Sequence, residues 1–119
     1  MAMGELPPGG ILKIPSSWVN SMSMNVGILK MRLRLPENMS LKGKRQVIKS
    51  VVAQLKNKFD ISAAEVADND LWQVATLGVA FISNDPRFTN EVLSKAAAFV
   101  ESGKFDAEFM DYETEIIPL

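Results

Sequence analysis

The hydrophobic positions of this chain follow two different periods, and the first of them predicts a strand. In residues 25–35, apolar side chains alternate with the cations Lys30, Arg32 and Arg34, and a period of two is typical of a strand with one buried face. Pro36 ends this strand, because proline has no N–H group to donate to a sheet.

Residues 40–59 follow a helical period instead. Between Ile48 and Phe59, apolar side chains fall at i, i+3, i+4, i+7 and i+11, which places them on one face of a helix. Ser40 is suited to cap the N-terminus of this helix with its hydroxyl group. The remaining positions predict a basic outer face made of six cations: Lys42, Lys44, Arg45, Lys49, Lys56 and Lys58.

Two further strands are predicted after this helix. Residues 61–67 are short and weakly apolar, which suits a strand at the edge of a sheet. Residues 73–83 are apolar nearly throughout, as in a central strand. Within this central strand we expect Gly78 to allow the close approach of a helix side chain.

A second helix and a last strand complete the pattern. The helix begins at residues 84–86, with proline at its first position, and ends before Gly103, which we expect in the left-handed conformation. In the last strand, residues 105–116, the apolar phase slips between Phe109 and Met110, which predicts a bulge.

The order β-α-β-β-α-β predicts an α+β protein of the ferredoxin-like class. Right-handed crossovers then place two helices on one face of a four-stranded antiparallel sheet. The first and last strands are neighbours in this topology, so three cations of the first strand are expected to face three carboxylates of the last: Lys30, Arg32 and Arg34 opposite Asp111, Glu113 and Glu115.

Composition and charge limit the possible chemistry. The chain has no cysteine and no histidine, which excludes thiolate and imidazole catalysis and the commonest metal ligands. Residues 25–59 contain nine Lys/Arg and one acid, whereas residues 60–119 contain three Lys/Arg and twelve acids. No secretory signal or membrane span is evident. We therefore expect a cytoplasmic protein that is not an enzyme, with no cofactor, no metal and no membrane partner.

Three segments carry a resemblance to a known family. The chain resembles the YlxP-like family of small bacterial proteins in S-L-K-G-K-R at residues 40–45, in F-D-I-S-A-A-E-V at 59–66, and in D-L-W-Q-V-A at 70–75 with L-G-V-A at 77–80 and S-N-D at 83–85. Gly43 and Val74 depart from the family pattern, which has an acid and a basic residue there. The resemblance implies a ferredoxin-like fold but no activity. Genes of this family often lie near those of ribosome-binding factor A and other translation factors, which implies a connection with RNA by association only.

The basic helix provides the main candidate site. Lys42, Lys44, Arg45 and Lys49 lie in its first turns, where free N–H groups also favour phosphate, so these four are the candidate RNA-binding residues. An ordinary solvated surface is the alternative interpretation. The first strand's Lys30, Arg32 and Arg34 are candidates for ion pairing or binding on the sheet face. That face offers no paired aromatic side chains of the kind that RNA-recognition domains stack on bases.

The turn between the second and third strands is a weaker candidate. Asp68 and Asp70 supply too few oxygen ligands for a calcium site, so we expect a polar turn. Trp72 is expected to fill the core or to lie at a subunit contact or pocket.

Two hypotheses follow for the function. In the first, residues 24–119 form a single domain that associates with the ribosome or structured RNA through the basic helix. In the second, the domain is a homo-oligomeric structural or small-ligand-binding module, such as a homodimer, in which the charges balance internally. Residues 1–23 contain three prolines and three glycines, and we expect them to be an N-terminal extension or arm.

Overall fold

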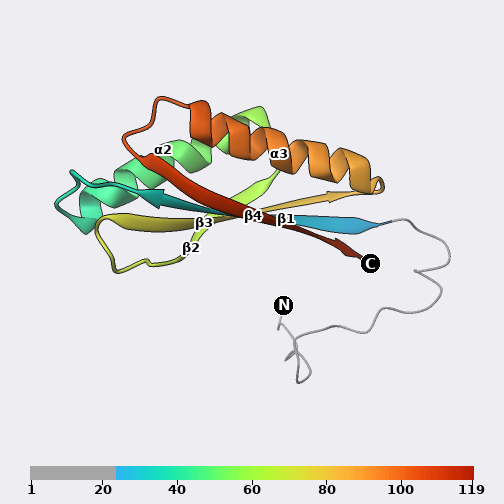
Figure 1. The fold of residues 1–119 in the computed structure, drawn as a ribbon, viewed down its shortest axis with the longest axis horizontal. Coiled ribbons are helices and arrows are strands. Elements are labelled where there is room, and N and C mark those ends of the chain that lie inside the picture. Colours follow the sequence, from blue (N-terminus) through green and yellow to red (C-terminus); the bar gives the residue numbers. More distant parts are fainter. Residues whose placement is uncertain (1–23) are drawn as a thin grey trace, which may run out of the picture.

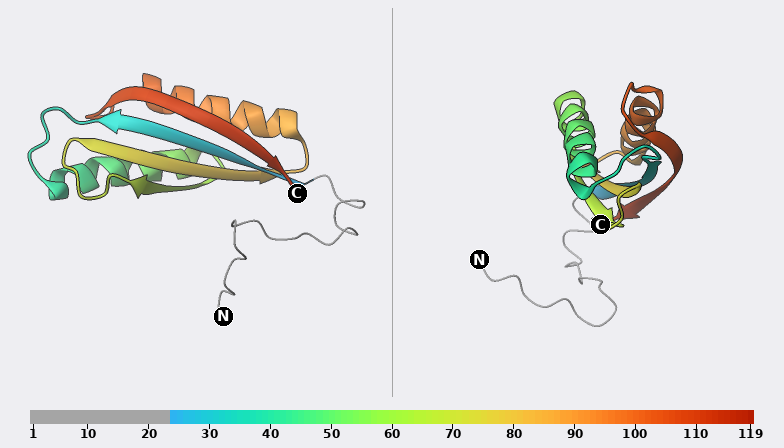
Figure 2. Two further views of the ribbon diagram at one scale, coloured as in Figure 1. Left: turned by 60° about the horizontal axis from the view of Figure 1, so that its bottom comes forward. Right: turned by 90° about the vertical axis from the view of Figure 1, so that its left-hand side faces the viewer.

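The structure of the protein is a computed structural model that describes residues 24–119. Four strands form one antiparallel sheet in the order β2-β3-β1-β4. Both helices cover the same face of the sheet (Figure 1, Figure 2). The other face, which no helix of residues 24–119 covers, is called the open face. The elements are, in chain order, β1 (Asn25–Arg34), α2 (Leu41–Lys58), β2 (Ser62–Ala67), β3 (Val74–Ser83), α3 (Pro86–Ser102) and β4 (Glu108–Pro118). The predicted ferredoxin-like α+β fold is confirmed, with the second strand at an edge and the third in the interior of the sheet. The predicted N-terminal arm lies outside the described residues.

Side-chain caps fix where the helices begin. The Ser40 hydroxyl accepts a hydrogen bond of 3.0 Å from the Gly43 amide at the start of α2, and the Asp85 carboxylate accepts one from the Arg87 amide at the start of α3. Each cap satisfies an N–H group that has no partner within its helix.

The end of α3 differs from the prediction. Gly103 has φ −70° and ψ 155°, which is extended rather than left-handed backbone. A Cβ atom at this position would lie 2.3 Å from the Phe105 ring and 2.9 Å from the Phe99 carbonyl oxygen. Glycine is needed here because the chain folds back closely on itself, not because of its φ angle.

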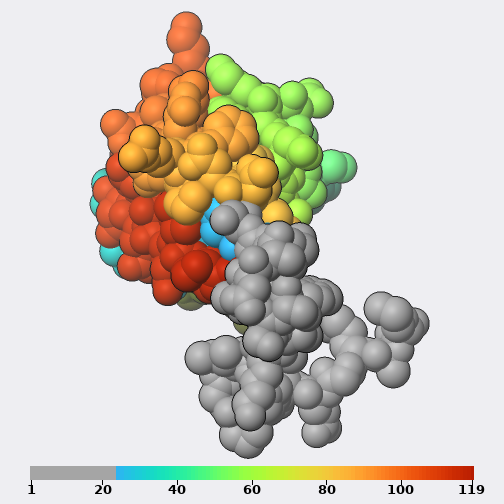
Figure 3. Space-filling model, turned by 90° about the vertical axis from the view of Figure 1, so that its right-hand side faces the viewer, coloured from blue at the N-terminus to red at the C-terminus, as the bar shows by residue number. Residues whose placement is uncertain are grey.

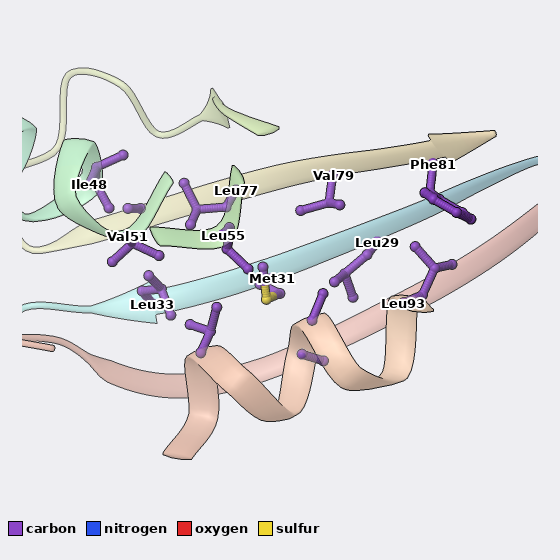
Figure 4. Close-up of a cluster of buried hydrophobic side chains, with 14 of the residues drawn as sticks. Leu29, Met31, Leu33, Ile48, Val51, Leu55, Leu77, Val79, Phe81 and Leu93 are labelled. Carbon is purple, nitrogen blue, oxygen red and sulfur yellow. The ribbon is translucent and has the colours of Figure 1, made fainter. Parts of the chain in front are cut away.

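The core lies between the helices and the two interior strands. Leu29, Met31 and Leu33 of β1 are almost completely buried beside Leu77 of β3, and α2 contributes Leu55 from above (Figure 4). In the end-on space-filling view, α3 lies between α2 and β4 (Figure 3). The strict alternation of β1 therefore follows directly from having helices on one side only.

The predicted bulge in the last strand is present. Arg32 pairs with Asp111 and the next residue, Leu33, pairs with Phe109, so Met110 is the extra residue of β4. The bulge lets Phe109 pack against the core while Asp111 points to the open face.

Close approach between helix and sheet occurs at a different glycine from the one predicted. Gly78 faces the open side, and a Cβ atom there would lie 2.8 Å from the Val66 side chain of the neighbouring strand. Gly27, on the covered side, is the contact with a helix: its Cβ would lie 2.3 Å from Thr89 and 2.9 Å from Leu93 of α3. The expectation for Gly78 was wrong because no helix covers that face.

Thr89 is held firmly above Gly27. It is fully buried, its hydroxyl donates a hydrogen bond of 2.6 Å to the Asn25 side chain, and it lies 2.6 Å from the Ser83 hydroxyl. A side chain at residue 27 would therefore have to displace the first turn of α3.

We predict that Gly27→Ala lowers the free energy of unfolding by about 1–3 kcal/mol, the usual cost of overpacking a well-packed site. Gly78→Ala is the matched control, because the exposed Val66 side chain can rotate away from the new methyl group. Urea denaturation of both variants measures the difference. An equal loss in the two variants would contradict the assignment of the helix contact to Gly27.

Candidate functional site

Helix α2 carries an uninterrupted positive face. No carboxylate occurs between residues 41 and 58. Four of its five exposed cations, Lys42, Arg45, Lys49 and Lys56, are separated by three, four and seven residues, so at about 100° per residue they lie within a sector of roughly 60°. We call these four residues the cationic stripe. It is about 21 Å long at 1.5 Å per residue.

The cationic stripe has no counter-charge in the described part of the chain. The ion pairs of residues 24–119 involve other cations: Lys30, Arg32, Arg34, Lys44 and Lys95. Lys58, at the end of α2, lies 4.9 Å from the centre of the Phe99 ring. The four stripe residues are therefore available to an external anion.

Lys44 does not belong to this surface, contrary to the expectation for the basic helix. Its side chain is 0% exposed. Its ammonium group donates hydrogen bonds to the carbonyl oxygens of Asp68 (2.7 Å), Val74 (3.2 Å) and Asn69 (3.3 Å). The Glu65 carboxylate lies 2.8 Å away. Lys44 is thus a structural residue and not a phosphate contact in this conformation.

The burial of Lys44 agrees with a feature of the sequence that the prediction overlooked. Residues 44, 48, 51 and 55 follow the spacing i, i+4, i+7 and i+11, and all four are buried on α2. The apolar stripe of the helix therefore extends one turn further towards its N-terminus, with a lysine in place of an apolar residue.

Glu65 supplies the negative charge that compensates for the burial of the Lys44 ammonium group. It lies on the covered face of β2, opposite Leu77 of β3. Its Oε2 atom is buried and has no hydrogen-bond donor among the described residues, because the three ammonium hydrogens of Lys44 are directed to carbonyl groups. The Glu65 carboxylate is therefore held in place by its electrostatic attraction to the Lys44 ammonium group.

The turn after β2 is structural, as expected of a polar turn. Asp68 has φ 63°, a left-handed conformation that aspartate tolerates better than most residues. Its carboxylate accepts a hydrogen bond of 2.7 Å from the Thr76 hydroxyl. Among residues 24–119 no cluster of three or more potential metal ligands is found.

Trp72 is 51% exposed, so the expectation that it fills the core was wrong, whereas a role at a subunit contact or pocket stays a prediction.

The three cations of β1 all face carboxylates of β4 on the open side of the sheet. Lys30 lies 3.8 Å from Glu113, and Arg32 makes two hydrogen bonds to Asp111, of 2.9 and 2.5 Å. Arg34 pairs with Glu108 at 2.8 Å. Glu115, the expected third carboxylate, lies opposite Ile28 instead, and the register shift at Met110 brings Glu108 opposite Arg34.

The pairing of Arg32 with Asp111 affects the ionisation of both groups. Hydrogen bonds from the Arg32 guanidinium lower the pKa of the Asp111 carboxyl below its usual value, and they outweigh the opposing effect of burial. The same contact raises the pKa of Arg32. Because both side chains are about half exposed, the pair contributes little to stability.

A hollow of about 610 Å³ lies at one end of the sheet. It is lined by the loop after β1, the start of α2 and the chain leading into β4, including Glu37, Asn38, Val47, Phe105 and Asp106. Its acidic groups lie on the side of α2 that turns away from the cationic stripe. We find no pair of a nucleophile and a base among its lining residues.

None of the helices in the described part of the chain is long and apolar enough to cross a membrane.

Fold and surface together define a small ferredoxin-like α+β domain with one basic helix and an internally paired sheet face. The chain belongs to the family described as "Protein of unknown function (DUF503)", which matches residues 26–114. It is 36% identical over 63 residues to the "Uncharacterized protein YlxP" of Bacillus subtilis (strain 168), covering 53% of this chain and 68% of that protein. The resemblance to the YlxP-like family is thereby confirmed.

Two designed proteins are among the similar solved structures. "De novo designed protein Foldit4" aligns with a TM-score of 0.46 and 10% identity over 78% of this chain and 94% of its own. "De novo designed protein Ferredog-Diesel" aligns with a TM-score of 0.36 and 12% identity over 76% of this chain and 83% of its own. The family description assigns no catalytic activity.

We predict that Lys44→Met lowers the free energy of unfolding by about 3–5 kcal/mol, the usual cost of removing one partner of a buried ion pair. The loss arises because Glu65 and three carbonyl groups remain buried without a partner. Lys49→Met is the control on the exposed face of the same helix and should change stability by no more than about 0.5 kcal/mol. Urea denaturation measures both, and a small loss for Lys44→Met would contradict its structural role.

A second prediction concerns ionisation on the sheet face. In the wild type, the Asp111 carboxyl should titrate below the ordinary aspartate pKa of about 3.9, and Arg32→Gln should return it towards that value. Because the folded-state pKa is lowered, the small stabilisation is present above the unfolded-state pKa and is lost as pH falls through the folded-state pKa. NMR titration of the carboxyl carbon measures this, with Arg34→Gln as a control that leaves Asp111 unchanged.

Proposed function

We propose that this protein is a non-enzymatic accessory protein that binds structured RNA, such as that of the ribosome, through the cationic stripe of α2. One observation carries the proposal: Lys42, Arg45, Lys49 and Lys56 lie in line on a helix without carboxylates and have no ion-pair partner in residues 24–119. The cations of the sheet, in contrast, are neutralised by β4.

The dimensions of the stripe suit a phosphate backbone. Along the helix axis, successive cations are separated by about 4.5, 6 and 10.5 Å, and their long side chains can adjust to neighbouring phosphates. Contacts of this kind release counterions and carry little sequence information. The expected binding is therefore salt-dependent and weakly sequence-specific.

The arrangement of the sheet keeps this surface apart from the acidic part of the molecule. α2 packs on β2, at one edge of the sheet, whereas the carboxylates of β4 lie at the opposite edge. The two helices are clearly separated in the end-on ribbon view (Figure 2). Local positive potential can thus persist on a chain whose net charge is −1.

Two further observations favour this mode of binding over others. The open face of the sheet has no aromatic side chain within the described residues, since Phe81 points into the core, so base stacking of the RNA-recognition type has no platform there. The absence of cysteine and histidine from the sequence removes the commonest catalytic nucleophile–base pairs.

We predict that the protein co-sediments with ribosomal subunits at low salt and that Lys42→Glu/Arg45→Glu/Lys49→Glu abolishes this association. The physical reason is loss of phosphate contacts. With about four contacts and a slope of about −0.7 per contact, raising salt from about 50 to about 200 mM should weaken wild-type binding by roughly 50-fold. Co-sedimentation and a filter-binding titration with ribosomal RNA measure the two effects.

The control is Arg87→Glu/Lys95→Glu/Lys104→Glu, which changes the net charge by the same amount but leaves α2 untouched. This variant should bind nearly as well as the wild type, and circular dichroism should show that both variants are folded. Equal loss in the two triple variants would indicate a general charge effect, and no association of the wild type at low salt would refute the proposal.

A further inference from the structure

The open face of the sheet has an apolar half that no element of the described chain covers. It is formed by Ile28 of β1, Ala64 and Val66 of β2, and Ala80 and Ile82 of β3. Val66 is 54% exposed and Ile82 is 64% exposed. We call these five residues the apolar patch. Contiguous exposed apolar surface of this kind marks interaction sites in proteins.

The patch has a shape that suits another flat surface. A shallow hollow of about 490 Å³ lies over it, with Gly78 and the two alanines in its floor. Small residues in the centre allow a second backbone to approach, and the larger side chains of Ile28 and Val66 also line the hollow. Both helices lie on the far side of the sheet (Figure 1), and the only helix residue that lines the hollow among the described residues is Lys56 of α2.

The charges beside the patch are nearly balanced, and Glu115, opposite Ile28, is the carboxylate of β4 on this face that has no ion-pair partner among the described residues. Three cations of β1 pair with three carboxylates of β4 on the same face. A two-fold interface brings the same surface of both subunits together, so a face with a large net charge would repel its copy. The open face has little net charge and would not repel its copy, whereas two cationic stripes would repel each other.

The available area also indicates what kind of partner fits. Strands of 10, 6, 10 and 11 residues, about 4.8 Å apart and rising about 3.3 Å per residue, present roughly 600 Å² of sheet. This is somewhat below the roughly 800 Å² that each partner buries in a standard interface. A surface of this size supports a weak, reversible association between copies.

We propose that the open face mediates a homodimer in which the two sheets stack on each other with β3 near the two-fold axis. The apolar patch forms the centre of this interface and the ion pairs of Lys30, Arg32 and Arg34 form its polar rim, the usual anatomy of an interface. Stacked sheets of this kind align within about 30° of each other. In this dimer the two α2 helices face outward, so the association does not depend on RNA binding.

Sedimentation velocity of the full chain between about 10 and about 500 µM, without RNA, tests the proposal. We expect a concentration-dependent monomer–dimer equilibrium. Ile82→Arg should raise the dimer dissociation constant at least about tenfold, because it places a charge in the apolar centre of the interface. Leu71→Arg is the matched control, since Leu71 is also exposed and lies outside the patch, and it should leave the dissociation constant unchanged.

Thermal unfolding of both variants, measured in parallel, tests whether they remain folded. A wild type that is monomeric at the highest concentration overturns the proposal, and so does a dimer that Ile82→Arg does not weaken. If the full chain is monomeric and Ile82→Arg increases proteolysis within residues 1–23, those residues occupy the patch and the second copy is excluded.

Discussion

The ammonium group of Lys44 joins three segments of the chain at one point inside the protein. It extends from the first turn of α2, pairs with Glu65 on β2, and holds the carbonyl groups at both ends of the β2–β3 connection. A charged group is expensive to bury, and it persists only where its hydrogen bonds and its counter-charge are all provided. The edge strand, the turn and the helix must therefore assemble together, which fixes how α2 lies on the sheet.

The orientation of α2 determines which of its cations reach solvent. Because Lys44 points into the protein along with Ile48, Val51 and Leu55, the residues at the opposite positions of the helix point outward. The cationic stripe is thus a consequence of the same packing that buries one lysine. One lysine of this helix is therefore structural, and the other cations of the helix are exposed to solvent.

The sheet has two faces with different chemistry for a similar reason. Helices cover only one side, so the alternate residues of β1 and β3 are buried there, and the residues between them form the open face. On that face the bulge at Met110 brings Asp111 opposite Arg32. One half of the open face becomes an array of paired charges, and the other half remains apolar. Each half of the open face limits what can bind there. The half with paired charges does not attract a charged ligand strongly, and the apolar half favours a partner that removes its side chains from water.

The sequence by itself determined the fold class, the order of the strands and the bulge at Met110, because hydrophobic periodicity records which side of each element is buried. It also indicated a basic helix, although the i, i+4 relation between Lys44 and Ile48 was needed to see that one lysine belongs to the core. Only the tertiary structure decided the partner of each charge. Arg34 pairs with Glu108, which was not among the three expected carboxylates. Lys44 pairs with Glu65, and the close contact with a helix lies at Gly27 rather than Gly78. These contacts join residues far apart in the chain, and the register and the covered face that bring them together are properties of the assembled sheet.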